Sequence, residues 1–188
     1  MISKSHRQPE ELFNDVIVEM GESDNTLPPV EHWNPPLSGD IDIRIDREGR
    51  WHHEGGLIQR EALVKLFSRI LKREGDDHFL VTPVEKWRIA VDVAPFFVTG
   101  LEVLEREGHQ ALLFSTSTGE HVVAGPDHPL LMDDASGDPT PLLNVRGNMV
   151  GLLSRPVFYQ LAELAQPGPV EKKAVQGVYS LGQFFALE

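Results

Sequence analysis

The stretch that decides the fold is residues 40–54, DIDIRIDREGRWHHE. Its isoleucines, Ile41, Ile43 and Ile45, alternate with charged side chains, which is the period-two pattern of a strand with one buried face. Residues 46–49 form a turn sequence that ends in Gly49, and glycine accepts the left-handed backbone that such turns require. Residues 50–54 therefore return beside the first strand, and the stretch predicts a β-hairpin.

Apolar periodicity predicts the elements that follow this hairpin. Helical spacing over residues 59–73, ended by Gly75, and over residues 154–165 predicts two amphipathic helices. Residues 125–141 are rich in Asp, Gly and Pro, which predicts a long loop. Strand patterns, two of which form a second hairpin, cover residues 78–82, 86–93, 101–104, 111–116, 120–124, 142–146 and 177–187.

These elements predict an α+β protein in which most strands are antiparallel. We expect a lead-in segment over residues 1–36, a hairpin–helix–strand module over residues 37–93, and a β-rich module with the second helix over residues 94–188. Apolar residues at positions 12, 13, 16 and 20 of the lead-in segment fall at helical spacing and predict a short helix over residues 9–20.

The composition argues against several classes of protein. The chain has 17 Lys and Arg against 29 Asp and Glu, a formal charge of −12 that disfavours binding to a nucleic-acid backbone. The absence of cysteine excludes disulfides, thiolate nucleophiles and Cys-ligated metals. No apolar run approaches the ~20 residues of a membrane span, and the first residues lead into no apolar signal-peptide region. We therefore expect a cytoplasmic protein with no nucleic-acid or membrane partner.

A short internal similarity relates two strand-to-helix junctions. Residues 56–60 (GLIQR) align with residues 151–155 (GLLSR) at an offset of 95, and four of the eleven positions from Gly56 to Leu66 are identical. Background composition gives roughly one identity over such a length. The similarity indicates either an internal repeat of β–helix–β modules or the general likeness of strand-to-helix junctions.

Arg60 and Arg155 occupy equivalent positions in this alignment, each near the start of a predicted helix. The helix macrodipole disfavours a cation there by ~0.3–1 kcal/mol, so an offsetting interaction is expected. One interpretation is an architectural arginine that donates to carbonyls or to a carboxylate such as Glu85. The other is a pair of anion-binding sites, in which each guanidinium acts with free helix N–H groups.

Histidine and carboxylate residues supply the candidates for chemistry. His52 and Glu54 would share one strand face, a spacing that suits metal ligands, although no third ligand is evident. His128, next to Asp127 in the predicted loop, is a candidate ligand-binding residue or general base. The chain has no nucleophile elbow, zinc-protease motif or phosphate-binding loop, so no catalytic residue, metal or cofactor is assigned.

Two further features concern partners. A basic stripe along the first predicted helix consists of Lys65, Arg69, Lys72 and Arg73. This stripe is either a solvated helix face with a Glu61–Lys65 ion pair or a docking surface for an acidic partner. The adjacent Phe96 and Phe97 place one ring on each face of a strand, so one ring is available to a cleft or a partner.

Eight short motifs of this chain match those of one bacterial family. They are GDIDIRI at residues 39–45, GRWHHEG at 49–55, IQR at 58–60, LVKLFS at 63–68, LVTPVEK at 80–86, APF at 94–96, DHPL at 127–130 and RPVFY at 155–159. On these motifs, about residues 34–188 resemble the family known as domain of unknown function 1285. The resemblance implies two small β-roll-like modules, each with a packed helix, and a signalling or regulatory role. It implies no established enzyme activity or cofactor, and it offers no catalytic pattern to transfer to single residues.

The sequence favours a cytoplasmic, non-catalytic module that binds a small molecule or a protein and regulates a process. Its candidate ligand-binding residues are Arg60, Glu85, Arg155 and His128. The first alternative is a metal-dependent or His/carboxylate hydrolase, which requires that four residues converge in one cleft: His52, Glu54, Asp127 and His128. The second alternative is an oligomeric scaffold that pairs edge strands, and the oligomeric state itself is left open.

Overall fold

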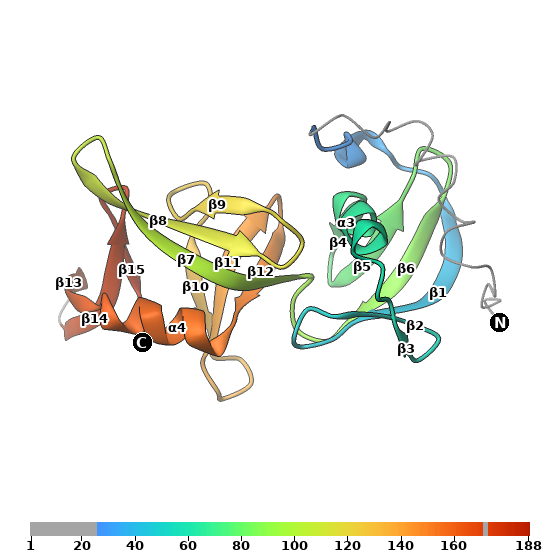
Figure 1. The fold of residues 1–188 in the computed structure, drawn as a ribbon. Helices are drawn as coiled ribbons and strands as arrows, with labels where there is room; N and C mark the ends of the chain where they lie inside the picture. The colour runs from blue at the N-terminus through green and yellow to red at the C-terminus, as the bar shows by residue number, and fades with distance from the viewer. Residues whose placement is uncertain (1–25, 171–172) are drawn as a thin grey trace. The chain divides into compact units, whose positions relative to one another are not determined.

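The structure, a computed structural model, describes residues 26–170 and 173–188. The chain divides into two compact units between Val93 and Ala94, called here the N-terminal and C-terminal domains (Figure 1). Both domains consist mostly of strands in mixed sheets, and the described residues contain two α-helices. The helix predicted over residues 9–20 lies outside the described residues. None of the described helices is long and apolar enough to cross a membrane.

The N-terminal domain is one six-stranded sheet with a helix. Its strand order is β3-β2-β1-β6-β5-β4, with β1 and β6 parallel and the other neighbours antiparallel. The predicted first hairpin is confirmed, since Ile45 of β1 lies opposite Trp51 of β2. Its elements are η1 (Val30–His32), β1 (Leu37–Ile45), β2 (Trp51–His53), β3 (Gly56–Leu57), α3 (Glu61–Arg69), β4 (Leu71–Glu74), β5 (Asp77–Val81) and β6 (Lys86–Val91).

The core of this domain lies between the sheet and α3. The alternation in β1 buries Ile43 and Ile45 almost completely, and Trp51 lies on the same face. Phe67 of α3 packs against Trp51 with ring centroids 5.9 Å apart. Burial of each such side chain stabilises the fold by about 1.5–3 kcal/mol. The face of the sheet that contacts α3 is called the inner face below, and the opposite face is the outer face.

The first helix is shorter than predicted. It ends at Arg69, and residues 71–74 form β4, antiparallel to β5. Leu71 lies opposite Leu80 of β5, and both are fully buried. Gly75, with φ +60°, lies in the turn between β4 and β5 and does not cap the helix. Pairing with a distant strand therefore outweighs the local helical pattern, and it divides the predicted basic stripe between a helix and a strand.

The C-terminal domain has a six-stranded sheet, order β10-β11-β12-β7-β8-β9, and a three-stranded sheet, order β13-β14-β15. Helix α4 contacts β7 and β14 (Figure 1). The predicted loop over residues 125–141 is wrong in part, because Leu130 and Leu143 are buried opposite one another and pair β10 with β11. The elements are β7 (Phe96–Arg106), β8 (His109–Thr116), β9 (His121–Val123), β10 (Leu130–Asp133), β11 (Thr140–Arg146), β12 (Met149–Leu153), α4 (Arg155–Glu163), β13 (Gln166–Val170), β14 (Lys173–Ser180) and β15 (Gln183–Ala186).

The order of elements supports the internal repeat. Both β1-β2-β3-α3-β4-β5-β6 and β10-β11-β12-α4-β13-β14-β15 are three antiparallel strands, a helix and three more antiparallel strands. From the helix onward, each element of the second set begins within two residues of its counterpart's start shifted by 95. The two sets differ in how their first and last strands pair. β1 and β6 pair in parallel, whereas β10 and β15 lie in contact but belong to separate sheets.

A buried serine joins the two sheets of the C-terminal domain. Ser180, at the end of β14, is fully buried. Its hydroxyl donates to the Ala124 carbonyl at 2.7 Å and accepts from the Leu112 N–H of β8 at 3.0 Å. One hydroxyl thus satisfies a buried donor and a buried acceptor that regular strand pairing leaves over.

Replacing Ser180→Ala removes both bonds, and we expect a loss of about 1–3 kcal/mol in the free energy of unfolding. Urea unfolding followed by circular dichroism measures this loss. Tryptophan fluorescence gives an internal reference that should not shift, because all three tryptophans lie in the N-terminal domain. The control is Ser136→Ala, at an exposed loop residue. Equal stability of the two variants would contradict the assignment.

His78 has a lowered pKa in the N-terminal domain. It lies on β5, opposite Arg73 of β4 and Ile89 of β6. Burial lowers its pKa, the charge of Arg73 lowers it further, and Asp77 opposes both effects. The unfolded chain therefore binds a proton at a higher pH than the folded domain does.

We expect the free energy of unfolding of this domain to fall as the pH drops below about 6.5, the unfolded pKa of histidine, until the lowered folded pKa is passed. The variant His78→Gln removes that titration, so its stability should change less over the same range. Urea unfolding followed by tryptophan fluorescence from pH 7.5 down to about pH 5 tests this. Parallel pH profiles for the wild type and the variant would show that His78 is not responsible.

Candidate functional site

The outer face of the N-terminal sheet carries a row of side chains across four strands. Cross-strand pairing places Arg44 of β1 beside His52 of β2 and Ala90 of β6, and His52 beside Leu57 of β3. Arg44 lies between two buried isoleucines in sequence and therefore faces away from the core. Arg44, Ala90 and Leu57 are exposed, and His52 is partly exposed. We call Leu57, His52, Arg44 and Ala90 the outer row.

A buried carboxylate fixes one side of this row. Asp46 directly follows β1, and its side chain is 8% exposed. It accepts hydrogen bonds from the Glu48 and Arg50 N–H groups, from Arg50 Nε and from His52 Nε2, at 2.8–3.0 Å. Burial raises the pKa of Asp46, but these donors outweigh it and the net direction is downward. Asp46 is therefore an ionised acceptor, and His52 Nε2 must carry the shared proton.

A bidentate ion pair between Arg44 and Asp92 fixes the other side of the outer row. Arg44 Nε donates to Asp92 Oδ1 at 2.9 Å, and Arg44 Nη2 donates to Asp92 Oδ2 at 2.5 Å. The hydrogen bond from Arg44 lowers the pKa of Asp92. Although the pair holds its geometry, the Arg44 side chain stays 53% exposed. The guanidinium is thus held in a single orientation by Asp92, while about half of the side-chain surface of Arg44 stays accessible to solvent.

The part of the outer face over β4 and β5 is occupied by the protein itself. Phe79 of β5 lies beneath the cations of Lys86 and Arg88, at 5.0 and 5.8 Å from its ring centroid. Lys72 of β4 donates to the Trp33 carbonyl at 3.0 Å and to Asn34 Oδ1 at 2.7 Å. The segment that precedes β1 is therefore attached to β4. The exposed polar surface is the part over β1, β2, β3 and β6.

His52 and Glu54 do not share one strand face, because β2 ends at His53. His52 lies on β2, but Glu54 follows the strand in a turn with φ +48°, and its N–H donates to the Asp42 carbonyl. His52 is instead paired with Asp46. Within residues 26–170 and 173–188, no three His, Asp or Glu side chains form a group that could hold a metal ion.

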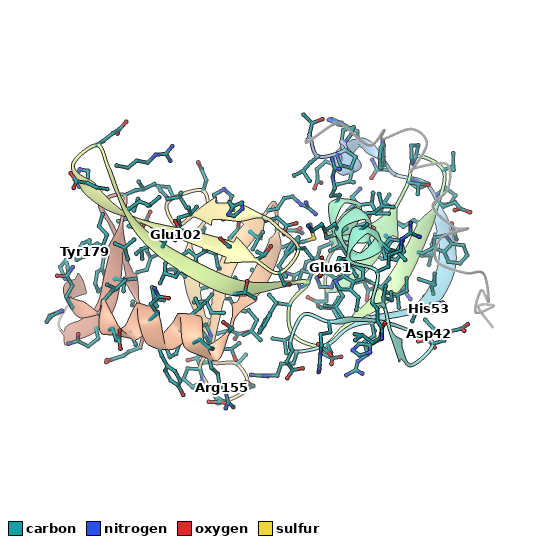
Figure 2. All side chains as sticks on the ribbon, in the orientation of Figure 1. Asp42, His53, Glu61, Glu102, Arg155 and Tyr179 are labelled. Atoms are coloured by element: carbon teal, nitrogen blue, oxygen red, sulfur yellow. The ribbon has the colours of Figure 1, made fainter. Side chains whose placement is uncertain are left out.

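The two equivalent arginines are exposed. Arg60 is the residue before α3. Arg155 is the first residue of α4, as Figure 2 shows. Neither forms an ion pair with any residue that the structure describes. Among the described residues no hydrogen bond or ion pair joins Glu85 to Arg60, and the N–H and carbonyl of Glu85 bond Thr82 at 2.9 and 2.8 Å. Glu85 therefore shapes the turn between β5 and β6, and anion binding at the arginines stays a prediction.

His128 stabilises a loop of the C-terminal domain. Its N–H and carbonyl each bond Gly125 at 3.1 Å, and its Nδ1 lies 3.2 Å from the Asn144 carbonyl of β11. The neighbouring Asp127 is exposed. Neither domain by itself collects the groups of the hydrolase hypothesis, since His52 and Glu54 belong to the first and Asp127 and His128 to the second.

Sequence reasoning identified His52 but missed Arg44, Asp46 and Asp92. The alternation of β1 contained the signal for two of them, because Arg44 and Asp46 fall on the face opposite the isoleucines. Asp92 could not be found in this way. It reaches Arg44 across the parallel pairing of β1 with β6, between residues 48 positions apart, and no local pattern indicates that pairing.

Comparisons with known proteins agree on one family. The family model described as domain of unknown function (DUF1285), N-terminal domain, matches residues 28–94, and that of the DUF1285 C-terminal domain matches residues 95–187. A crystal structure of a DUF1285 family protein from Silicibacter pomeroyi is 42% identical, covering 91% of this chain and 92% of that one, with a TM-score of 0.78. Another, from Shewanella baltica, is 27% identical, covering 64% and 90%, with a TM-score of 0.52. No curated protein matches the chain.

We expect Asp46→Asn to lower the free energy of unfolding of the N-terminal domain by about 1.5–3 kcal/mol at neutral pH, because charged acceptors form the stronger hydrogen bonds. The folded pKa of Asp46 is lowered, so this contribution is complete above its unfolded pKa of about 4 and is lost as the pH falls through the folded value. The difference between variant and wild type should therefore narrow below about pH 4.

Urea unfolding followed by tryptophan fluorescence measures both effects. The matched control is Asp42→Asn, an exposed carboxylate on the same strand that has no side-chain partner among the described residues. That control should change the stability by less than about 0.5 kcal/mol. An Asp46→Asn variant as stable as the control would show that the four donors do not stabilise the fold.

Proposed function

Because the chain belongs to the DUF1285 family, whose function is unknown, we propose its function from its own geometry: it is a non-catalytic module that binds a protein partner through the outer row. The observation that carries the proposal is the state of Arg44. Its side chain is more than half exposed, yet its guanidinium is already held by two hydrogen bonds to Asp92. A side chain ordered before binding loses less conformational entropy when a partner arrives.

The neighbours of Arg44 suit a protein surface. Ala90, beside Arg44, and Leu57, on the far side of His52, lie at the ends of the row and offer apolar contact. Arginine is enriched among the residues that dominate binding energy, and its planar face stacks on aromatic rings. A partner that lays an aromatic side chain on the Arg44–Asp92 pair and covers Leu57 would use all of these features.

The polar groups of the row support binding more than catalysis. The Asp46 carboxylate is saturated by four donors, and the ring nitrogen of His52 that faces it is occupied. No described serine or threonine hydroxyl is hydrogen-bonded to His52, so a nucleophile–base pair is not assembled at this ring. The proposal includes a regulatory role in the cytoplasm, which the absence of cysteine supports.

The proposal can be tested by site-specific cross-linking in the native host cell. A photo-reactive amino acid at Ala90 lies in the outer row, and the same residue at Val84, which is 71% exposed in the turn between β5 and β6, is the control. We expect one discrete protein adduct at position 90 that is absent at position 84 and lost when Arg44→Glu is added. Equal labelling at the two positions, or an adduct that survives Arg44→Glu, would refute the outer row as the binding surface.

With the cross-linked partner purified, Arg44→Ala should weaken binding by about 2 kcal/mol, which is roughly 30-fold in Kd. Calorimetric titration measures this change. Arg106→Ala, at an exposed arginine of the C-terminal domain, is the control and should leave the Kd unchanged within error. If both variants bind like the wild type, Arg44 is not an anchor of the interface.

A further inference from the structure

Helix α3 presents a mixed apolar and basic flank. Its core-facing residues are Leu63 and Phe67, both buried. Ala62, Lys65, Leu66 and Arg69 follow one another at helical spacing along a different side, and we call them the α3 flank. Ala62 and Lys65 are exposed, and Leu66 and Arg69 are partly exposed. The predicted Glu61–Lys65 ion pair is not formed, so the Lys65 ammonium has no ion-pair partner within the part of the chain that the structure describes.

The chain enters the described structure at this flank. Arg69 donates from Nη2 to the carbonyl of Thr26, which is the first described residue. The sequence before it has the opposite character to the flank. Residues 9–20 contain four acidic residues and neither Lys nor Arg, and four of their apolar residues, at positions 12, 13, 16 and 20, have helical spacing.

We propose that the α3 flank is the docking site of residues 9–20 of the same chain. The apolar positions of this segment cover Leu66 and Ala62, and its carboxylates face Lys65 and Arg69. The link is long enough. Residues 21–25 can span up to roughly 17 Å when extended, and the nine residues of α3 are roughly 13 Å long. The segment can therefore return along the whole flank.

Because residues 9–20 are tethered to the domain, a modest contact area with the α3 flank is sufficient for docking. A segment joined by a short link acts at an effective concentration on the order of millimolar, so a docking affinity that would be negligible between separate molecules still populates the bound state. The apolar contacts bury Leu66, while the ion pairs set the orientation of the segment. An external acidic segment can reach the flank only by displacing residues 9–20.

Paramagnetic relaxation in the full chain tests the proposal. The chain has no cysteine, so Asn14→Cys introduces a unique thiol for a nitroxide label, on the side of the helical pattern away from positions 12, 13, 16 and 20. We expect the amide signals of residues 62–69 to lose most of their intensity. Adding Phe13→Asp and Val16→Asp, which change only the segment, should restore them. Lys65→Glu should restore them in part, whereas the matched charge reversal Arg47→Glu, at an exposed arginine of the β1–β2 turn, should not.

Three results would overturn the proposal. The first is full intensity of the α3 amides in the labelled chain. The second is a loss of intensity that persists with Phe13→Asp and Val16→Asp. The third is a loss that appears when a spin-labelled chain is mixed with an isotope-labelled chain that carries no spin label, because the occupant of the flank is then a second copy.

Discussion

Strand β1 is the element on which the rest of the N-terminal domain depends. It pairs antiparallel with β2 and parallel with β6, so it joins the two halves of the six-stranded sheet. Its period-two alternation sends Ile43 and Ile45 into the core and Arg44 and Asp46 to the outer face. A shift of one residue in its register would exchange the two sets. Burial of the isoleucines therefore also determines where the candidate site lies.

The same coupling explains how the side chains of the candidate site are held in place. Asp46 accepts bonds from the backbone of its own turn and from His52 on the returning strand, so it serves the hairpin and the outer row together. Asp92 follows β6 directly, and its N–H continues the parallel ladder by donating to the Ile45 carbonyl. Its carboxylate then reaches Arg44. Both anions that hold the row are thus placed by backbone pairing, which leaves little freedom for the side chains between them.

Local patterns in the sequence predicted local structure well. The hairpin at Ile45 and Trp51, the second hairpin and helix α4 follow from alternation, turn residues and helical spacing that lie within a few residues. The predictions were wrong where pairing with a separate strand determines the secondary structure. Leu71 continues a helical pattern but pairs with Leu80, and Leu130 lies in a loop-like composition but pairs with Leu143. For the same reason His52 could be proposed from sequence, whereas its setting between Asp46 and the Arg44–Asp92 pair could not.

The repeat explains why one domain has this site and the other does not. The Arg44–Asp92 contact exists because β1 and β6 are hydrogen-bonded neighbours in one sheet. Their counterparts β10 and β15 touch but end in separate sheets, and β12, the counterpart of the edge strand β3, pairs in parallel with β7 as well as with β11. The equivalent of the outer row is therefore broken at the joint that corresponds to the pairing of β1 with β6. If the two halves arose from one module, this change in strand pairing removed the geometry of the row from the C-terminal half and kept it in the N-terminal domain.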